Sequence, residues 1–494
     1  MKPTKEQEQA IDFSNGNQSF KISAYAGAGK TTTLKLIGQS LNRSGTYLAF
    51  NKEIAEDARQ KFPENVQSQT FHAMAYKETP KFLKEKLSHP RLMPNHIINF
   101  FNFSPCNLPL EKNNNQFAVC TSYDQAMILV RALDNFCRST DSEPTYEHSF
   151  RAMPDWADKG YCHDLAYDLV YKVHQLWELQ ISKNYKYKIS HDVYLKHWAL
   201  QDPEINSSFI LFDEAQDADP VMLDILSKQN TQKIYVGDRH QQIYGFRGAI
   251  NAMQSLDLPE VYLTQSFRFG GRISDIANVI LKHLLNESKP LRGNDSIRST
   301  LNMTDKSQAY LARTNAGALA TGLKLLTEGH RPKLNLNMQS LLKQVKDSEK
   351  LQNNLSVDKN SEFFGFSNWN EVLDYVEAYP KSDLVPIVAL IEGNSTQYLI
   401  NIINKIAATK SYDCMVSTAH RAKGLEFETV ELGDDFFWSR DQDELIMTPS
   451  EARLLYVACT RAINNLDISR MIELFKELKK RLTSTHKDSQ ISIN

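Results

Sequence analysis

The sequence predicts an α/β protein built on parallel sheets, and three stretches carry this prediction. The first is a glycine-rich loop, residues 24–31, between a strand-like and a helix-like stretch. The second is an alternation of strands and helices over residues 20–70, which is typical of parallel sheets. The third is an apolar run that ends in two carboxylates, Asp213 and Glu214. Together they indicate a sheet whose strand ends bind a charged ligand.

The glycine-rich loop follows the pattern A-x-x-x-x-G-K-T, with Ala24 in place of the usual first glycine. Apolar residues alternate before it and recur at helical spacing after it, namely Phe20, Ile22 and Ala24, then Leu34, Ile37 and Leu41. Between a strand and a helix, such a loop turns its backbone N–H groups toward phosphate oxygens. We therefore expect Lys30 to neutralise phosphate charge and Thr31 to hold Mg²⁺.

Residues 3–11 predict a short amphipathic helix ahead of this loop. Gln7 lies in it, and an amide that both donates and accepts can read the edge of an adenine. A plain surface glutamine is the alternative interpretation.

Two more strands are expected at 47–50 and 66–70, with a helix between them. In parallel sheets the carboxyl ends of the strands carry the ligand, so residues at those ends are candidate contacts. They are Phe50, Asn51, Lys52, Thr70, Phe71 and His72.

Residues 76–200 are rich in Lys, Asn, Tyr and Phe, and they predict an inserted, mostly helical subdomain. Helices are expected at 122–136 and 165–179. The stretch Tyr185–Lys188 interleaves aromatic and charged side chains, which suits a nucleic-acid surface or an ordinary solvated face equally.

The α/β pattern resumes with the strand 209–212. Asp213 can bind Mg²⁺ directly or through water, and Glu214 can polarise an attacking water. A strand at 233–236 then leads to Gln241, a candidate sensor of a γ-phosphate. The aromatic residues Tyr244 and Phe246 follow two residues apart.

Beyond residue 330 the pattern is less regular. The Asn-rich stretch Asn335–Asn354 is expected to be a loop. Strand 414–417, helix 451–462 and a basic amphipathic helix at 471–482 are expected to follow, and residues 483–494 are expected to be disordered.

Composition narrows the class of protein. The chain has 494 residues, a net charge of −2 and a pI near 6.7, so any nucleic-acid site must be a local patch. Its six cysteines form no C-x-x-C pair and no signal peptide is evident, which favours a reducing, intracellular (cytoplasmic) compartment. Their irregular spacing disfavours an iron–sulfur cluster. No apolar run approaches the roughly 18 residues of a membrane span.

Nine motifs occur in a fixed order along the chain. They are Gln7, Ser23–Thr33, Phe50–Lys52, Thr70–His72, Asp213–Asp217, Gly237–Ala249, Ser266–Arg268, Thr418–Phe427 and Tyr456–Arg461. In order and approximate spacing they resemble the UvrD/Rep branch of superfamily 1 helicases. In motif detail the resemblance is closest to the F-box DNA helicase type, although no F-box is evident.

The resemblance implies two RecA-like motor domains of the P-loop NTPase class with helical inserted subdomains. The first motor domain would comprise residues 1–75 and 201–262, with 76–200 inserted. The second would comprise 263–330 and 405–482, with a small insertion at 331–404. It implies ATP and Mg²⁺ as cofactors.

The resemblance also assigns roles residue by residue. Lys30, Thr31, Asp213, Glu214, Gln241, Arg268 and Arg461 would be catalytic, with Thr31 and Asp213 as metal ligands and the two arginines as arginine fingers. ATP would contact Gln7, Ala24, Tyr25, Ala26, Gly27, Ala28, Gly29, Lys30, Thr31, Thr32 and, through its ribose, Glu426. DNA would contact Phe50, Asn51, Lys52, Thr70, Phe71, His72, Tyr244, Phe246, Arg247, Arg313, His420 and Lys423.

The implied activity is ATP-dependent 3′-to-5′ translocation on single-stranded DNA and unwinding of DNA, coupled to closure of the motor domains. Single-stranded DNA and DNA junctions would be the partners, in repair, recombination or defence. Two other hypotheses stay open, a DNA-stimulated ATPase that strips protein–DNA complexes and a motor that depends on a protein partner. The chain departs from the family at Phe246, where Trp is usual, and in its short second insertion.

Overall fold

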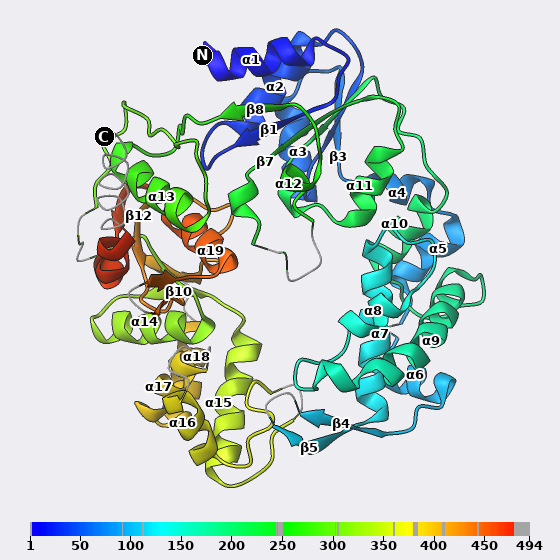
Figure 1. Cartoon of the computed structure of the whole chain (residues 1–494), viewed down its shortest axis with the longest axis vertical. Coiled ribbons are helices and arrows are strands. Elements are labelled where there is room, and N and C mark those ends of the chain that lie inside the picture. Colours follow the sequence, from blue (N-terminus) through cyan, green and yellow to red (C-terminus); the bar gives the residue numbers. More distant parts are fainter. Residues whose placement is uncertain are drawn as a thin grey trace, which may run out of the picture. The chain divides into compact units, whose positions relative to one another are not determined.

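The computed structural model describes residues 2–90, 92–110, 113–243, 245, 250–301, 303, 306–358, 361–378, 384–407, 411–441 and 444–478. The chain forms two compact units, which we describe separately (Figure 1). The first unit comprises residues 1–23, 30–239 and 244–261. The second comprises residues 24–29, 240–243 and 262–494. The phosphate-binding loop itself, residues 24–29, therefore groups with the second unit.

The first unit is built on a six-stranded sheet with the order β3-β2-β6-β7-β1-β8. Its strands are β1 (Phe20–Ala24), β2 (Gly45–Leu48), β3 (Val66–Gln69), β6 (Phe209–Phe212), β7 (Gln232–Gly237) and β8 (Glu260–Leu263). The pairings β3–β2, β2–β6, β6–β7 and β7–β1 are parallel. All four residues of β2 and of β6 are buried, as expected where both faces of a parallel sheet are covered.

Helices of the first unit follow the strands in the predicted alternation. They are α1 (Lys5–Ser14), α2 (Lys30–Ser40), α3 (Lys52–Lys61), α4 (Phe71–Glu78), α11 (Pro220–Ser227) and α12 (Ala252–Ser255). Leu34 and Ile37 of α2 are fully buried. The predicted strand–loop–helix around the phosphate loop is thus confirmed.

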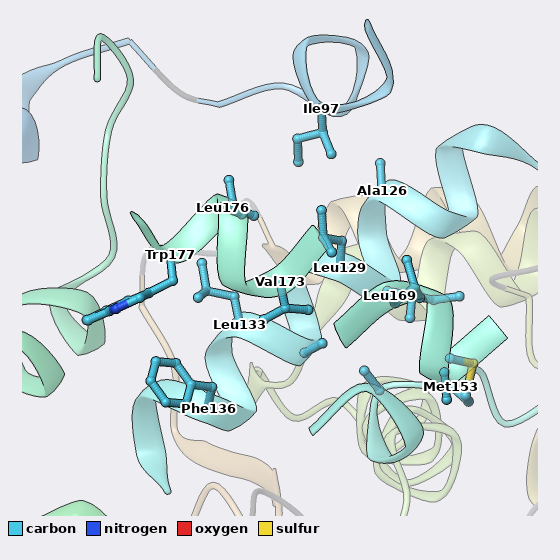
Figure 2. Close-up of a cluster of buried hydrophobic side chains, with 14 of the residues drawn as sticks. Ile97, Ala126, Leu129, Leu133, Phe136, Met153, Leu169, Val173, Leu176 and Trp177 are labelled. Carbon is cyan, nitrogen blue, oxygen red and sulfur yellow. The ribbon is translucent and has the colours of Figure 1, made fainter. Parts of the chain in front are cut away.

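The inserted segment of the first unit is mostly helical. Its helices are α5 (Lys81–Glu85), α6 (Pro94–Phe101), α7 (Ser122–Arg138), α8 (Tyr146–Arg151), α9 (His163–Ile181) and α10 (His191–Ala199). Figure 2 shows the core between α7 and α9, with Leu133 and Val173 among its side chains. Tyr185 joins this core at 8% exposure, so the first aromatic residue of the 185–188 stretch is not a surface residue.

An antiparallel hairpin in this segment was not predicted. It pairs β4 (Cys106–Leu110) with β5 (Asn113–Cys120). Pro109 and the run of asparagines from Asn113 mask the alternation of polar and apolar residues by which a strand is recognised.

The second unit contains a five-stranded sheet with the order β10-β11-β9-β12-β15, in which every neighbouring pair is parallel. Its strands are β9 (Ala309–Ala312), β10 (Pro332–Asn335), β11 (Cys414–Thr418), β12 (Phe427–Leu432) and β15 (Ala462–Asp467). Helices α13 (Gly271–Leu284), α14 (Asn315–Thr327) and α19 (Pro449–Cys459) accompany the sheet, and β13 (Ser439–Asp441) pairs with β14 (Glu444–Ile446). Two parallel sheets with helices confirm the predicted fold class.

The predicted loop at 335–354 is wrong. Most of it forms helix α15 (Met338–Gln352), which begins where the side chain of Asn337 accepts a hydrogen bond from the N–H of Ser340. Leu341 and Val345 recur at helical spacing and are fully buried. The asparagines of the stretch all lie outside this helix, so they do not interrupt its apolar stripe. Helices α16 (Trp369–Ala378), α17 (Val385–Glu392) and α18 (Thr396–Ala407) complete the insertion.

At the end of the chain, residues 472–478 are helical, as predicted. The remainder of the predicted 471–482 helix and the predicted tail at 483–494 lie outside the described residues. Among the helices that the structure describes, none has the length and apolarity to cross a bilayer. The predicted domain boundaries stay predictions.

Candidate active site

In the first unit, Lys30 begins helix α2, and its Nζ lies 2.8 Å from Oε1 of Glu214. Burial opposes the charged form of Lys30. The nearby carboxylates of Glu214, Asp213 and Asp238 outweigh it and raise the pKa of Lys30 above its ordinary value. Lys30 is therefore charged, and a carboxylate occupies the position beside its ammonium group that a phosphate oxygen would take.

Asp213 follows β6 and is 5% exposed. Its Oδ2 accepts a hydrogen bond from the Tyr47 hydroxyl (2.8 Å), and its Oδ1 accepts one from the N–H of Glu214 (2.9 Å). Burial and the neighbouring charge of Glu214 raise the pKa of Asp213 to about 6, while Lys30 and Tyr47 oppose that rise. The two carboxylates predicted at the strand end do lie together with Lys30.

Glu214 has a left-handed backbone, with φ of 53°. This conformation costs a non-glycine residue about 1 kcal/mol or more, and such strain is common at functional sites. It lies between the end of β6 and the 3₁₀ turn Ala215–Asp217, and its side chain contacts Lys30.

Gln216 is a site residue that the sequence analysis missed. It is fully buried, and its amide nitrogen donates to Oε2 of Glu214 and to Oδ2 of Asp217. Its Oε1 accepts from the N–H of Asp238 at 3.0 Å. Gly237 makes room for it, because a Cβ there would lie 2.3 Å from that oxygen. Gln216 thus joins the candidate base to the end of β7; its place two residues after Glu214 was the available signal.

Gln7 is buried at 4% exposure, so the interpretation as a plain surface glutamine is wrong. Its Oε1 accepts from the N–H of Thr4 at 3.0 Å, and its Nε2 donates to Oγ1 of Thr33 at 3.1 Å. The bond from Thr4 is part of a capping box at the start of α1, and the bond to Thr33 fixes the amide relative to helix α2. One N–H and one oxygen lone pair remain for an adenine edge.

In the second unit, the loop 24–29 needs its glycines for backbone conformation and for space. Gly27 has φ of 71° and Gly29 has φ of 75°. The N–H of Phe267 donates to the carbonyl of Gly27 at 2.8 Å, and a Cβ on Gly27 would lie 2.6 Å from Oγ of Ser266. Any larger residue at 27 would therefore push the loop away from residues 266–268.

Two tyrosines hold the same loop. The hydroxyl of Tyr25 donates to the carbonyl of Lys289 at 2.8 Å. The hydroxyl of the fully buried Tyr456 accepts from the N–H of Ala26 at 3.1 Å. The loop thus lies in the second unit beside residues 266–268 and Tyr456.

Arg268 donates through Nη1 to the carbonyl of Thr460 (2.9 Å) and through Nη2 to the carboxylate of Glu426. Its Nε–H is buried and has no acceptor among the described residues. A buried guanidinium donor without an acceptor is costly, so it marks a place where an anionic ligand would be favoured.

Arg461 is 1% exposed and is the largest of the fully buried side chains described. Nε donates to the carbonyl of Val457 at 2.9 Å, and Nη1 donates to that of Leu425 at 3.4 Å. Nη2 donates to Oε1 of Gln241 at 3.4 Å. The second unit therefore brings together the loop 24–29, Gln241, Arg268, Arg461 and Glu426.

Two family descriptions match the parts of the chain that carry these residues. An AAA domain matches residues 7–247, and a UvrD-like helicase C-terminal domain matches residues 413–466. The chain is thus similar to UvrD-like helicases.

Relatives of this UvrD-like chain are named helicases. It is 30% identical to "F-box DNA helicase 1" of Gallus gallus, over 96% of this chain and 49% of the relative. It is 28% identical to "F-box DNA helicase protein 1" of Schizosaccharomyces pombe, over 95% of this chain and 57% of the relative. The "Probable DNA helicase II homolog" of Mycoplasma genitalium is 31% identical over 20% of this chain and 16% of the relative. The chain thus spans about half the length of the first two relatives.

Seven of the twelve DNA contacts predicted for this UvrD-like chain fall into three groups. Phe50 (54% exposed) and Lys52 are open to solvent in the first unit. Asn51 and Thr70 cap helices α3 and α4 with their side-chain oxygens. Tyr244, Phe246 and Arg247 lie outside the described residues.

Phe71 does not fit its predicted role as a stacking residue. It is 2% exposed, and its ring meets that of Phe212 edge to face with the centroids 5.5 Å apart. A ring packed in the core offers no face to a base, so burial argues against stacking. The neighbouring His72 is partly exposed, and its Nε2 lies 3.1 Å from Oδ1 of Asp192.

The remaining predicted DNA contacts belong to the second unit. Nε of Arg313 donates to Oε1 of Glu451 at 2.6 Å, and its guanidinium lies 4.9 Å from the ring centroid of Phe437. Nζ of Lys423 donates to the carbonyl of Gln241 at 2.7 Å. His420 is half-buried after β11. Lys423 therefore contacts Gln241, the candidate sensor of the γ-phosphate, directly.

The donor set suits Mg²⁺ in this UvrD-like site. The predicted ligands, Thr31 and Asp213, offer a hydroxyl and a carboxylate, the hard oxygen donors that Mg²⁺ prefers. Thr31 and Thr32 are exposed in the first turn of α2. Each Asp213 oxygen accepts from one protein donor among the described residues and keeps a lone pair. The described residues contain no cluster of three or more His, Cys, Asp or Glu arranged for a metal. Such a set fits Mg²⁺ bound mainly through phosphates and water.

Proposed function

We propose that the chain is an ATP-dependent DNA helicase that translocates 3′ to 5′ on single-stranded DNA. The observation that carries the proposal is how the candidate ATP-site residues group within each of the two units. Lys30, Asp213 and Glu214 form one cluster, and the loop 24–29 lies with Arg268 and Arg461. The similarity to UvrD-like helicases and the names of the relatives support the choice of DNA as substrate.

In the first unit, Lys30 would leave Glu214 and bind the β- and γ-phosphates. Glu214, freed from the lysine but still held by Gln216, would accept the proton of the attacking water. Gln7 would bind the adenine edge. Thr31 and Asp213 would hold Mg²⁺, which neutralises phosphate charge when it is bound.

In the second unit, Arg268 and Arg461 would stabilise the charge that spreads over the γ-phosphoryl group in the transition state. Gln241 contacts Arg461 and Lys423, so it can report the presence of a γ-phosphate to both. Glu426 would bind the ribose. Closure of the two motor domains around ATP would couple turnover to movement along the strand.

DNA would contact Phe50, Lys52 and His72 in the first unit and Arg313, His420 and Lys423 in the second. An exposed aromatic ring stacks on any base, and cationic groups bind phosphates, so recognition would be independent of sequence. Asn51, Thr70, Tyr244, Phe246 and Arg247 remain part of this proposal as backbone or stacking contacts.

The test is an ATPase assay with and without single-stranded DNA, paired with unwinding of duplexes that carry a 3′ or a 5′ tail. We expect DNA to stimulate ATP turnover at least about tenfold, and unwinding from the 3′ tail only. Single-stranded RNA of the same sequence is the control for the substrate. Absence of stimulation by DNA would overturn the proposal.

The same assay separates the alternative of a protein-stripping ATPase. The short second insertion, 331–404, motivates that alternative. Turnover stimulated by DNA without unwinding of a bare forked duplex, together with removal of a protein bound to the strand, would favour it. A need for a protein partner would show as activity restored only by cell extract.

A further inference from the structure

We propose that Tyr47 is a positioning residue that fixes the carboxylate of Asp213 for the divalent cation of the nucleotide. The inference rests on the proposed function, and it assigns a role to a residue outside the predicted site. The hydroxyl of Tyr47 donates to Oδ2 of Asp213 at 2.8 Å in a buried environment.

The register of the sheet explains how the two side chains meet. Tyr47 of β2 is the parallel partner of Leu211 of β6. Successive residues of a strand point to opposite faces, so Asp213, two residues beyond Leu211, lies on the same face as Tyr47. A diagonal neighbour at this distance is within reach of a tyrosine but of few shorter side chains.

Tyr47 is held rigidly where it makes this contact. It is fully buried, and its ring packs on Phe62 with the centroids 4.5 Å apart. The N–H of Asp213 donates to the carbonyl of Leu48 at 3.2 Å, which fixes the backbone of the carboxylate to the same strand, β2. Both ends of the hydrogen bond are therefore anchored to β2.

The two donors on Asp213 fix the carboxylate plane. The Tyr47 hydroxyl binds Oδ2 and the N–H of Glu214 binds Oδ1. The terminal torsion of an aspartate is otherwise broad, so two donors on different oxygens remove that freedom. A carboxylate fixed in advance meets the narrow octahedral geometry of Mg²⁺ without reorganisation.

The test replaces Tyr47 by Phe, which keeps the ring and removes the hydroxyl. Tyr235→Phe is the matched control, because Tyr235 is a buried tyrosine on β7 of the same sheet whose ring packs on Phe212. The measurement is binding of a fluorescent ADP analogue across a Mg²⁺ titration, with affinity in EDTA and thermal unfolding recorded in parallel.

We expect Y47F to raise the Mg²⁺ concentration for half-maximal binding about tenfold, the usual effect of losing a hydrogen bond to a charged group. Binding in EDTA and the midpoint of Y235F should stay within about twofold of the unsubstituted protein. An unchanged midpoint in Y47F, or an equal shift in both variants, would overturn the inference.

Asp213→Asn gives a second route, which does not depend on how well Y47F folds. Without the carboxylate the Mg²⁺ dependence should weaken, and adding Y47F should shift the midpoint no further. A further shift would contradict a role through Asp213. If the unsubstituted protein shows no Mg²⁺-dependent binding of nucleotide, the proposed function fails, whereas normal dependence with an unaffected Y47F refutes only the role of Tyr47.

Discussion

Lys30 of the first unit and Arg461 of the second unit are held in different ways. In the first unit, the ammonium of Lys30 is paired with the carboxylate of Glu214 at 2.8 Å. In the second unit, the guanidinium of Arg461 donates to neutral acceptors, among them the carbonyls of Val457 and Leu425. The contact of Lys30 thus pairs charge with charge, whereas these contacts of Arg461 pair a charge with backbone oxygens.

This difference indicates separate tasks for the two clusters. A phosphate can replace Glu214 beside Lys30, because both partners are anions, and the replacement frees the glutamate for chemistry. The carbonyls hold the guanidinium of Arg461 in place and are not anions that a phosphate would replace. Lys30 is thus suited to exchange its anionic partner. The fixed guanidinium of Arg461 is suited to stabilise negative charge that develops in a transition state.

Removal of the Lys30 ammonium group should have the largest effect. Lys30→Ala is expected to lower ATP turnover by more than about 10³-fold, because both phosphate binding and the partner of Glu214 are lost. Binding of single-stranded DNA should be retained. Steady-state ATPase rates and fluorescence anisotropy with labelled DNA measure the two effects, and Lys35→Ala on the same helix is the control. Residual turnover near that of the unsubstituted chain would refute the assignment of Lys30.

Substitution of Arg461 should have the second largest effect. Arg461→Lys keeps the charge but cannot reach the carbonyls of Val457 and Leu425 together, so we expect kcat to fall about 10²- to 10³-fold. It should also lower the free energy of unfolding by about 2 kcal/mol, because buried carbonyls lose their donor. Arg470→Lys, which alters a partly exposed ion pair with Glu431, is the control. A normal kcat in a destabilised Arg461→Lys would leave Arg461 a structural residue only.

A smaller effect is expected where a neutral side chain supports the first cluster. Gln216→Ala removes the donor to Glu214, so we expect kcat to fall about tenfold with the KM for ATP little changed. Initial-rate measurements over a range of ATP concentrations separate the two constants. A rise in KM at constant kcat would show that Gln216 supports binding and not the candidate base.

The smallest effect concerns stability of the nucleotide-free protein. The pKa of Asp213 is about 6 in the folded chain, above its ordinary 3.8, because the site is buried and Glu214 is adjacent. A raised pKa favours the protonated folded state, so its stabilising contribution is full below about pH 4 and is lost as pH rises through 6. Asp213→Asn should therefore raise Tm at pH 8 relative to pH 5 by about 2 °C more than the exposed control Asp57→Asn does. If Asp213→Asn changed Tm equally at pH 5 and pH 8 in EDTA, the raised pKa of Asp213 would be contradicted.

Local pattern was enough to predict the first parallel sheet and the cluster of Lys30, Asp213 and Glu214, whereas the second sheet was implied by the resemblance to helicases. Strand ends of a parallel sheet meet at one edge, so residues distant in sequence could be grouped from their positions after strands. The role of Tyr47 could not be predicted in this way, since it depends on the register between β2 and β6. The burial of Phe71 likewise depends on packing against Phe212, which one sequence does not reveal.

The hydrogen bond between Ala26 and Tyr456 has a consequence for the turnover of product. The loop N–H already has an acceptor before a nucleotide arrives, so a phosphate at this position would exchange one bond for another. Such an exchange adds little net affinity. When ADP leaves, the hydroxyl of Tyr456 can take the same N–H again, and the loop is not left with an unsatisfied buried donor. If the chain hydrolyses ATP as proposed, Tyr456 would thus favour release over retention of product.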